Sequence, residues 1–462
     1  MLLPMAPTDS MFLLGESREH PMHVGGLVLF EPPEGGSARD VRDMLDAALE
    51  RDWVSPRLRS RPRRSLTTLG QWGWETEEQI DLAHHVRHDA LPQPGGVAEL
   101  MTLVSRLHAS LLDRDRPLWE MHLIEGLADG RFAVYTKIHH ALADGVAAMR
   151  LLRSALSEDQ DARDMPAPWE PAAPRLELVP AAAAEGAADL AGAAARAARA
   201  AIGEAMGLVP ALVDTVDRAV HGRGGTLALA APSSLLNVPI GGARRFAARS
   251  WPLERLRLVA KCADATINDV VLAMCAGALR TFLADIDALP AEPLHAMVPV
   301  SLRNEQHRGG EGNEIGMLTC NLGTHLADPE ERLGVVRAAM ADGKDAMRSR
   351  SATQIRAMSA LGVAPLALGI VLGRHSPIRP ANVMISNVPG PRAPLYWNGA
   401  RMTALYPLSI PVDGQALNIT CTSTDSEIAF GLTGCRRTVP ALAPLLDHLD
   451  TELAELERVV GL

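Results

Sequence analysis

The sequence has few cysteines and no excess of positive charge, and each shortage excludes a class of protein. Its 462 residues contain five cysteines, an odd number with no CxxC pair, so we expect neither a disulfide framework nor a zinc site. Lys+Arg 45 against Asp+Glu 55 leaves a net charge of −10, which argues against a general electrostatic grip on nucleic acid. The cysteines are Cys262, Cys275, Cys320, Cys421 and Cys435.

A secretion signal and a long apolar run are also missing. The opening, MLLPMAPTDSMFLLGESREH, has no basic n-region and no small-residue cleavage site, so we expect a cytoplasmic protein that keeps this segment. The longest uncharged stretch, residues 357–373, is 17 residues long and contains Pro365, whereas a membrane-spanning helix needs about 20 residues. We interpret it as a buried or surface-seated helix; an interfacial helix that collects hydrophobic substrates is the alternative.

The residues that are present predict a soluble chain of two larger units and a connector. A hydrophobic content of 47% with 22% charged residues is enough to bury a substantial core, and the length predicts two or three domains. Five prolines in residues 165–180 indicate an exposed connector, and 15 alanines among the 28 residues of 181–208 favour a helix. We therefore predict an N-terminal domain at 1–164, a crossover linker and helix at 165–235, and a C-terminal domain at 236–462.

Both larger units have the pattern of a mixed α/β fold. RFAVYTKIHH at 131–140 is typical of a strand, and VAAMRLLRSAL at 146–156 has helical spacing. In the second unit, the strand-like runs AMVPVS, NVMISNVP and ALNITCTS alternate with predicted helices at 268–283 and 330–347.

The strand and helix of the first unit flank the most informative motif, HHALADG at 139–145. A neutral imidazole there can take a proton from a hydroxyl that attacks an acyl carbon, and the absence of a GxSxG elbow argues against an acyl-enzyme hydrolase. Structural interpretations stay open, because paired histidines can lie on the surface and Asp144 before Gly145 is a good helix N-cap. The spacing lacks HExxH and a third ligand, so no metal is expected. The other pair, His84-His85, is interpreted as structural or as surface residues.

HHALADG resembles the HHxxxDG signature of the CoA-dependent acyltransferase superfamily, which includes chloramphenicol acetyltransferase and peptide-synthetase condensation domains. Further blocks, in family order, narrow the resemblance to the bacterial wax ester synthase/diacylglycerol acyltransferase family. These blocks are PTDSMFLLGESREHPMHVGGLVLF from Pro7, PLWE from Pro117, NDVVLA from Asn268, VPVSLR from Val298 and SNVPGP from Ser386.

The resemblance implies two chloramphenicol acetyltransferase-like α/β domains, joined by a helical crossover, with a substrate channel at their interface. His140 would be the general base and His139 its support. Asp144 would face away from the substrate and, with Gly145, fix the loop, through an ion pair that we assign to Arg303.

Two further motifs are expected near the channel. Asn268 and Asp269 resemble the family's second motif, where an amide could donate to the thioester carbonyl. A plain helix N-cap at Thr266, Asn268 or Asp269 fits the spacing equally well. Ser386 and Asn387, followed by Pro389 and Gly390, resemble the third block, and their contact with substrate is implied by resemblance alone.

By resemblance, the reaction is transfer of a long-chain fatty acyl group from acyl-CoA to the hydroxyl of diacylglycerol, without a covalent intermediate. Alternatives are a wax ester synthase that uses long-chain alcohols, a non-catalytic lipid-binding scaffold, and a condensation-like enzyme that uses a carrier-protein thioester. No permanently bound cofactor is implied, with acyl-CoA as co-substrate, and we expect peripheral association with a membrane or lipid droplet.

Two local features complete the prediction. RLRSRPRR at 57–64 holds five arginines, which form either a solvated loop or a site for CoA phosphates or anionic lipid. Trp119 in PLWE is expected to pack in the core near the channel, without a chemical role.

Overall fold

The computed structural model describes residues 2–170 apart from 34, 37, 52 and 65–69, then 231–301, 315–350 apart from 349, positions 354, 355 and 358, and 379–462. The predicted helix at 181–208, Arg303, and all of the apolar stretch 357–373 except Met358 lie outside these residues. The predictions about them stay predictions.

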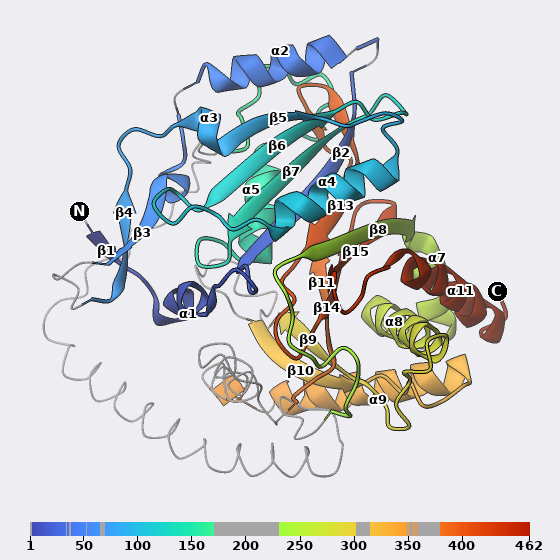
Figure 1. Ribbon diagram of the computed structural model, residues 1–462. Coiled ribbons are helices and arrows are strands. Elements are labelled where there is room, and N and C mark those ends of the chain that lie inside the picture. The colour runs from blue at the N-terminus through green and yellow to red at the C-terminus, as the bar shows by residue number, and fades with distance from the viewer. Residues whose placement is uncertain are drawn as a thin grey trace, which may run out of the picture.

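Two six-stranded sheets lie side by side, each covered by helices (Figure 1). The first sheet has the order β12-β13-β2-β7-β6-β5, and with α2, α4 and α5 it forms what we call the first lobe. Helices α2 and α5 pack on one face of this sheet, and α4 packs on the other. Its strands are β2 (His23–Glu31), β5 (Val86–Ala90), β6 (Trp119–Glu125), β7 (Phe132–His139), β12 (Tyr396–Trp397) and β13 (Ala400–Leu408).

The second sheet, with the order β10-β9-β11-β14-β15-β8, forms the second lobe with α7, α8, α9 and α11. These four helices gather against one face of the sheet, where the largest cluster of buried apolar side chains lies (Figure 1). The strands are β8 (Arg244–Pro252), β9 (His295–Ser301), β10 (Ile315–Asn321), β11 (Val383–Pro389), β14 (Leu417–Ser423) and β15 (Glu427–Cys435).

The helices and a small third sheet complete the description. The third sheet has the order β1-β4-β3 and lies beside α1 in the first half of the chain. Its strands are β1 (Leu2–Pro4), β3 (Ser60–Arg64) and β4 (Trp72–Thr76). The helices are α1 (Pro7–Gly15), α2 (Ala38–Leu49), η1 (Pro56–Arg59, a 3-10 turn), α3 (Leu82–His85), α4 (Val97–Ala109), α5 (Gly145–Ser154), α7 (Leu253–Cys262), α8 (Ile267–Ala284), α9 (Pro329–Arg348) and α11 (Ala443–Val459).

The local predictions from hydrophobic periodicity are confirmed. The strand and helix around HHALADG are β7 and α5, and the helices predicted at 268–283 and 330–347 are α8 and α9. Helix α8 is long and apolar enough to cross a membrane by length and composition. Most of it is buried in the second lobe, as expected for the core helix of a globular fold.

One strand crossing was not predicted. Strands β12 and β13 follow β11 in sequence, yet β13 pairs antiparallel with β2 and so completes the first sheet. The predicted C-terminal unit, 236–462, had included this segment among its own elements. The difference arises because alternation of apolar residues predicts a strand but does not identify its partner, which depends on long-range packing.

The crossing brings the two sheets into tight contact. A Cβ atom at Gly431 of β15 would overlap the carbonyl oxygen of Pro407 in β13, so only glycine fits there. On the outer side, Ser105 of α4 accepts a hydrogen bond from the backbone N–H of Phe246 in β8 at 2.9 Å. The two lobes are therefore joined by close backbone packing as well as by covalent connection.

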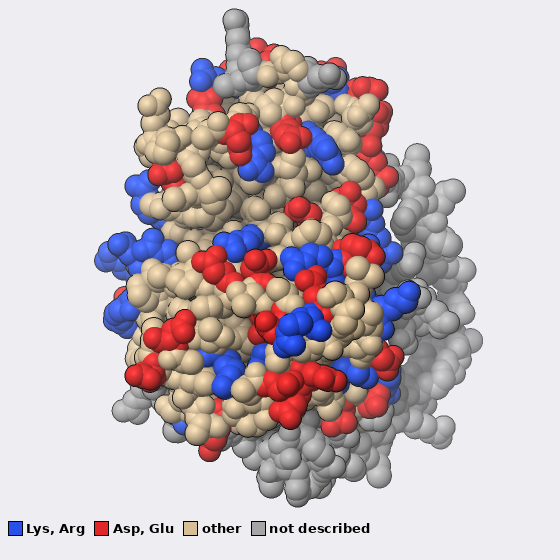
Figure 2. Space-filling view, turned by 90° about the vertical axis from the view of Figure 1, so that its right-hand side faces the viewer, with Lys and Arg blue, Asp and Glu red and all other residues tan. Residues whose placement is uncertain are grey.

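Surface charge in the described part of the molecule is mixed. Figure 2 shows basic and acidic side chains interspersed over one face. On the face shown, the described residues do not form the continuous basic surface that holds a nucleic acid backbone.

Candidate active site

HHALADG forms a tight turn between β7 and α5. Three of its backbone N–H groups bind carbonyl oxygens: His140 N donates to Met22 at 2.8 Å, and Leu142 N and Ala143 N donate to His139 at 2.8 and 3.1 Å. These hydrogen bonds fix the path of the backbone after β7 and place His140 beside α1.

His140 has the properties of a neutral base. Its ring stacks on Phe12 of α1, with centroids 4.1 Å apart and planes 21° from parallel. Burial lowers the pKa of His140 to about 4, although the nearby charge of Asp144 acts in the opposite direction. The imidazole is thus unprotonated at neutral pH and able to accept a proton.

His139 is fully buried, and each of its ring nitrogens has a polar neighbour. Its Nδ1 accepts a hydrogen bond from the Ala141 N–H at 3.1 Å, and its Nε2 lies 3.3 Å from Oε1 of Glu16. An accepting Nδ1 places the proton on Nε2, where it faces a carboxylate. His139 therefore connects the turn to the end of α1.

The sequence interpretation missed Glu16. Its side chain is 1% exposed, and it also accepts from the Met22 N–H at 3.2 Å and from Arg114 Nε at 3.0 Å. Burial acts to raise the pKa of this carboxyl, but hydrogen bonding to His139 and Met22 and the charge of Arg114 outweigh it and lower the pKa. A glutamate in a polar segment after a short helix gives no sequence signal of such burial.

Asp144 and Gly145 begin α5. Asp144 Oδ1 accepts from the Ala147 N–H at 2.7 Å, so the carboxylate is the helix N-cap. A Cβ atom added to Gly145 would lie 3.9 Å from Cγ2 of Val388 in β11, in ordinary contact. The start of α5 therefore lies against the second lobe. The predicted partner Arg303 is outside the described residues.

The SNVPGP block meets the HHALADG loop at this point. Side chains alternate along β11, and Ile385 lies in the core of the second lobe, so Ser386 shares the opposite face with Val388. Ser386 is therefore on the side of the HHALADG loop, whereas Asn387 is on the side of Ile385. A Cβ atom at Gly390 would overlap the Ser423 carbonyl, which explains glycine there.

The second motif is tied into the start of α8. Asp269 Oδ2 accepts from Thr266 N at 2.9 Å and from Thr266 Oγ1 at 2.7 Å, while Asp269 N donates to Thr266 Oγ1 at 3.2 Å. This reciprocal pair is a capping box in which Thr266 is the N-cap and Asp269 the third helical residue, so the N-cap interpretation is confirmed for Thr266. Asn268 is half-buried, and its proposed hydrogen bond to a thioester stays a prediction.

The arginine-rich segment makes contacts within the protein. Arg61 Nε and Arg63 NH1 donate to Glu75 Oε2 at 3.0 and 2.9 Å across the β3–β4 pair. Arg64 lies 4.5 Å from the centre of the Trp72 ring, and Arg59 Nε donates to the Glu77 carbonyl at 2.9 Å. These contacts favour a structural role for the four arginines; a site for CoA or lipid stays a prediction.

Two sequence interpretations concern core residues. Trp119 is buried as expected, and its Nε1 donates to the Leu58 carbonyl at 2.8 Å. His85, also buried, stacks on Trp119, and its Nδ1 lies 2.8 Å from the Trp119 carbonyl. The structural interpretation of His84-His85 therefore holds for His85.

Among the described residues, no group of three or more His, Cys, Asp and Glu side chains could hold a metal ion.

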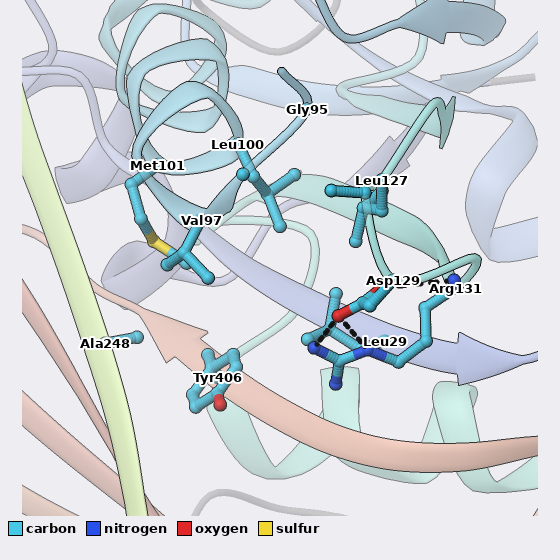
Figure 3. Close-up of a pocket in the computed structure, with 12 residues that line it drawn as sticks. Leu29, Gly95, Val97, Leu100, Met101, Leu127, Asp129, Arg131, Ala248 and Tyr406 are labelled. Atoms are coloured by element: carbon cyan, nitrogen blue, oxygen red, sulfur yellow. Dashed lines mark hydrogen bonds and ion pairs between the residues drawn. The ribbon is translucent and has the colours of Figure 1, made fainter. Parts of the chain in front are cut away.

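A cavity of about 150 Å³ lies at the far end of the first sheet (Figure 3). Leu29, Leu100 and Tyr406 line it, and Arg131 is held there by Asp129, with Nε to Oδ2 at 2.9 Å. Leu29 pairs with Ala133, six residues along β7 from His139, which is about 20 Å. This cavity is therefore separate from the HHALADG loop, and the interfacial channel stays a prediction.

Comparison with known proteins places this geometry in a family. A model of the wax ester synthase/diacylglycerol acyltransferase catalytic domain matches residues 5–271, and a model of the C-terminal domain of that family matches residues 311–457. A putative diacylglycerol O-acyltransferase of Mycobacterium tuberculosis is 54% identical over 478 residues, which cover 100% of this chain and 91% of that protein. A probable diacylglycerol O-acyltransferase of the same species is 47% identical over 460 residues, 99% of each chain.

Solved structures agree with the two-lobed architecture. The wax ester synthase/diacylglycerol acyltransferase from Marinobacter aquaeolei VT8 matches with a TM-score of 0.78 at 40% identity, over 99% of this chain and 100% of that one. The first condensation domain of the calcium-dependent antibiotic synthetase, at 18% identity and a TM-score of 0.60, covers 100% of this chain and 97% of its own and shares the fold. The predicted fold class is confirmed, and the chain belongs to the wax ester synthase/diacylglycerol acyltransferase family of acyltransferase enzymes.

Proposed function

We propose that the protein transfers a long-chain fatty acyl group from acyl-CoA to the free hydroxyl of diacylglycerol, with His140 as general base. The observation that carries this proposal is a half-buried imidazole, stacked on Phe12 and neutral at pH 7, in the loop whose far end meets the second lobe. His140 takes the hydroxyl proton as the oxygen attacks the thioester carbon. The tetrahedral intermediate then collapses to the ester, and the CoA thiolate leaves with the proton.

The acceptor is assigned from the relatives. The Mycobacterium tuberculosis proteins at 54% and 47% identity bear the name diacylglycerol O-acyltransferase, whereas the Marinobacter protein at 40% identity bears both names. We therefore place diacylglycerol ahead of long-chain alcohols. No permanently bound cofactor takes part in the proposed steps, because proton transfer and acyl transfer need only the histidine and the two substrates.

The acceptor assignment is tested by release of free CoA from palmitoyl-CoA with dipalmitoylglycerol, with hexadecanol or with no acceptor. We expect the fastest release with dipalmitoylglycerol and recovery of triacylglycerol as product. A preference for hexadecanol would move the assignment to wax ester synthesis. Equal release with and without acceptor would contradict transfer to an alcohol, and activity only with a carrier-protein thioester would contradict free acyl-CoA as donor.

We further propose that the protein acts in the cytoplasm at a lipid surface, with α1 against the lipid. Met11 and Leu14 on this helix are 45% and 50% exposed, while Phe12 between them stacks on His140. Apolar side chains beside the site can enter the interfacial layer of a membrane. We expect co-sedimentation with diacylglycerol-containing vesicles that a Met11→Ser, Leu14→Ser variant weakens. Complete recovery of the wild type in the supernatant at low salt would contradict the proposal.

A further inference from the structure

We propose that Arg57 is a positioning residue for the HHALADG loop and, through it, for His140. Arg57 lies on the 3-10 turn η1, and its Nε donates to the carbonyl oxygen of Leu142 at 2.6 Å. Leu142 is 85 residues away in sequence, at the centre of the motif. The inference rests on the proposed role of His140 as base.

Arg57 binds the Leu142 carbonyl, a group that receives no donor from the hydrogen bonds of the loop given above. Hydrogen bonds within the turn and from Met22 and Asp144 hold the N–H groups of residues 140–143 and 147. The Leu142 carbonyl points to a separate element, where a guanidinium donates to it. A charged donor makes a shorter and stronger hydrogen bond than a neutral one, so Arg57 is suited to fixing the turn.

The turn that carries Arg57 is itself anchored on the first lobe. The Leu58 carbonyl accepts from Trp119 Nε1 at 2.8 Å, and Ser55 N donates to the Trp169 carbonyl at 2.8 Å. Leu58 is buried, and Trp119 in β6 pairs with Ile138 in β7. The indole of Trp119 therefore supports the backbone from which Arg57 reaches the loop, which links the PLWE block to HHALADG.

Arg57 differs from its neighbours in the arginine-rich segment. The contacts of Arg59, Arg61, Arg63 and Arg64 end on residues 72–78 and on the Asp115 carbonyl, whereas the Arg57 contact ends in the motif. The Arg57 side chain is exposed, so its replacement removes a hydrogen bond without opening a cavity. The expected consequence is a misplaced His140 in a folded protein.

The test compares Arg57→Met, which keeps an unbranched stem without a donor, with Arg57→Lys, which keeps one charged donor. The matched control is Arg42→Met, which removes an exposed arginine of the same lobe from its contact with Glu125. We expect Arg57→Met to lower kcat about ten- to a hundredfold, with KM for palmitoyl-CoA changed less than twofold, because misplacement of a catalytic group by about 1 Å costs up to about a hundredfold. Arg57→Lys should recover part of the loss, and Arg42→Met should match the wild type.

Two readouts separate positioning from other roles. A loosened loop exposes His140 to water, so kcat/KM of Arg57→Met should fall between pH 7.5 and 5.5, where the wild type stays constant. Hydrogen exchange of the amides of residues 140–147 should be faster in Arg57→Met than in Arg42→Met, whether or not the proposed reaction is correct. Unchanged exchange and kcat would overturn the proposal. A raised, salt-dependent KM with unchanged kcat would also overturn it and assign Arg57 to CoA binding. Failure of the proposed function is distinguishable, because the wild type and His140→Ala would then have equal rates.

Discussion

Replacing His140 with alanine lowers the acceptor-dependent rate of CoA release by about 10²- to 10⁴-fold, the range that a positioned general base contributes. Without the imidazole, the hydroxyl must lose its proton to water. Phe12 then faces a gap, but the backbone of the turn keeps its hydrogen bonds to Met22 and His139. The change should therefore act on kcat and leave the thermal unfolding midpoint within a few degrees of the wild type.

The matched control is His88→Ala, which removes a more exposed histidine 3.5 Å from Glu125 in the same lobe. We expect it to keep the wild-type rate. If His140→Ala retains more than about a tenth of the rate, the base is another group. A wild type with no acceptor-dependent rate would favour the non-catalytic scaffold.

The pH profile tests the same assignment without a substitution. A histidine with a pKa of about 4 is more than about 95% neutral at pH 5.5, so kcat/KM should be constant from pH 7.5 to 5.5 and fall only as the pH approaches 4. A histidine with the ordinary pKa near 6.5 would be only about 10% neutral at pH 5.5. A tenfold loss of kcat/KM at pH 5.5 would therefore contradict the lowered pKa of His140.

Local features of the fold could be predicted because they depend on neighbouring residues. The alternation in RFAVYTKIHH and the helical spacing after Gly145 predict β7 and α5 within one or two residues. The capping box at Thr266 and Asp269 follows from a three-residue spacing, although that spacing alone could not separate a structural role from a catalytic one. The HHALADG motif identified the loop because its residues are consecutive.

Contacts between distant segments could not be predicted in the same way. Glu16 meets His139, and Arg57 meets Leu142, across more than eighty residues of sequence, and no periodicity encodes either contact. A buried Glu16 contradicts the usual exposure of glutamate and is stable only because His139, Arg114 and the Met22 N–H surround it. The same limit applies to β13, whose partner strand lies more than 350 residues away.

A buried ion pair beside the site should be essential for stability. Lys137 on β7 is fully buried, and its Nζ lies 3.0 Å from Oε2 of Glu120 on β6. The same ammonium donates to the carbonyls of Leu107 and Ser110 at 3.2 and 3.1 Å. Although burial alone would raise the pKa of Glu120, hydrogen bonding to His122 and the charge of Lys137 lower it to about 2. Glu120 is therefore ionised in the folded protein at every pH near neutrality.

Lys137→Met should lower the free energy of unfolding by about 3 to 5 kcal/mol, because it leaves the Glu120 carboxylate buried without its closest cation. The matched control, Lys261→Met, changes an exposed lysine in the last turn of α7 and should cost less than about 1 kcal/mol. Urea unfolding of the three proteins measures both values.

The Glu120 carboxyl determines how the loss of unfolding free energy in Lys137→Met depends on pH. A carboxyl whose folded pKa is lowered contributes stability above its unfolded value near 4.5 and loses it as the pH falls toward 2. The difference in unfolding free energy between the wild type and Lys137→Met should therefore be largest at pH 7 and decrease below pH 4.5. Adding Glu120→Met to Lys137→Met should recover part of the stability, because it removes the uncompensated charge. Equal unfolding midpoints for Lys137→Met and Lys261→Met would contradict this prediction. In that case His122 and Arg87, both 3.6 Å from Glu120, would compensate the buried charge, and the ion pair with Lys137 would be dispensable for stability.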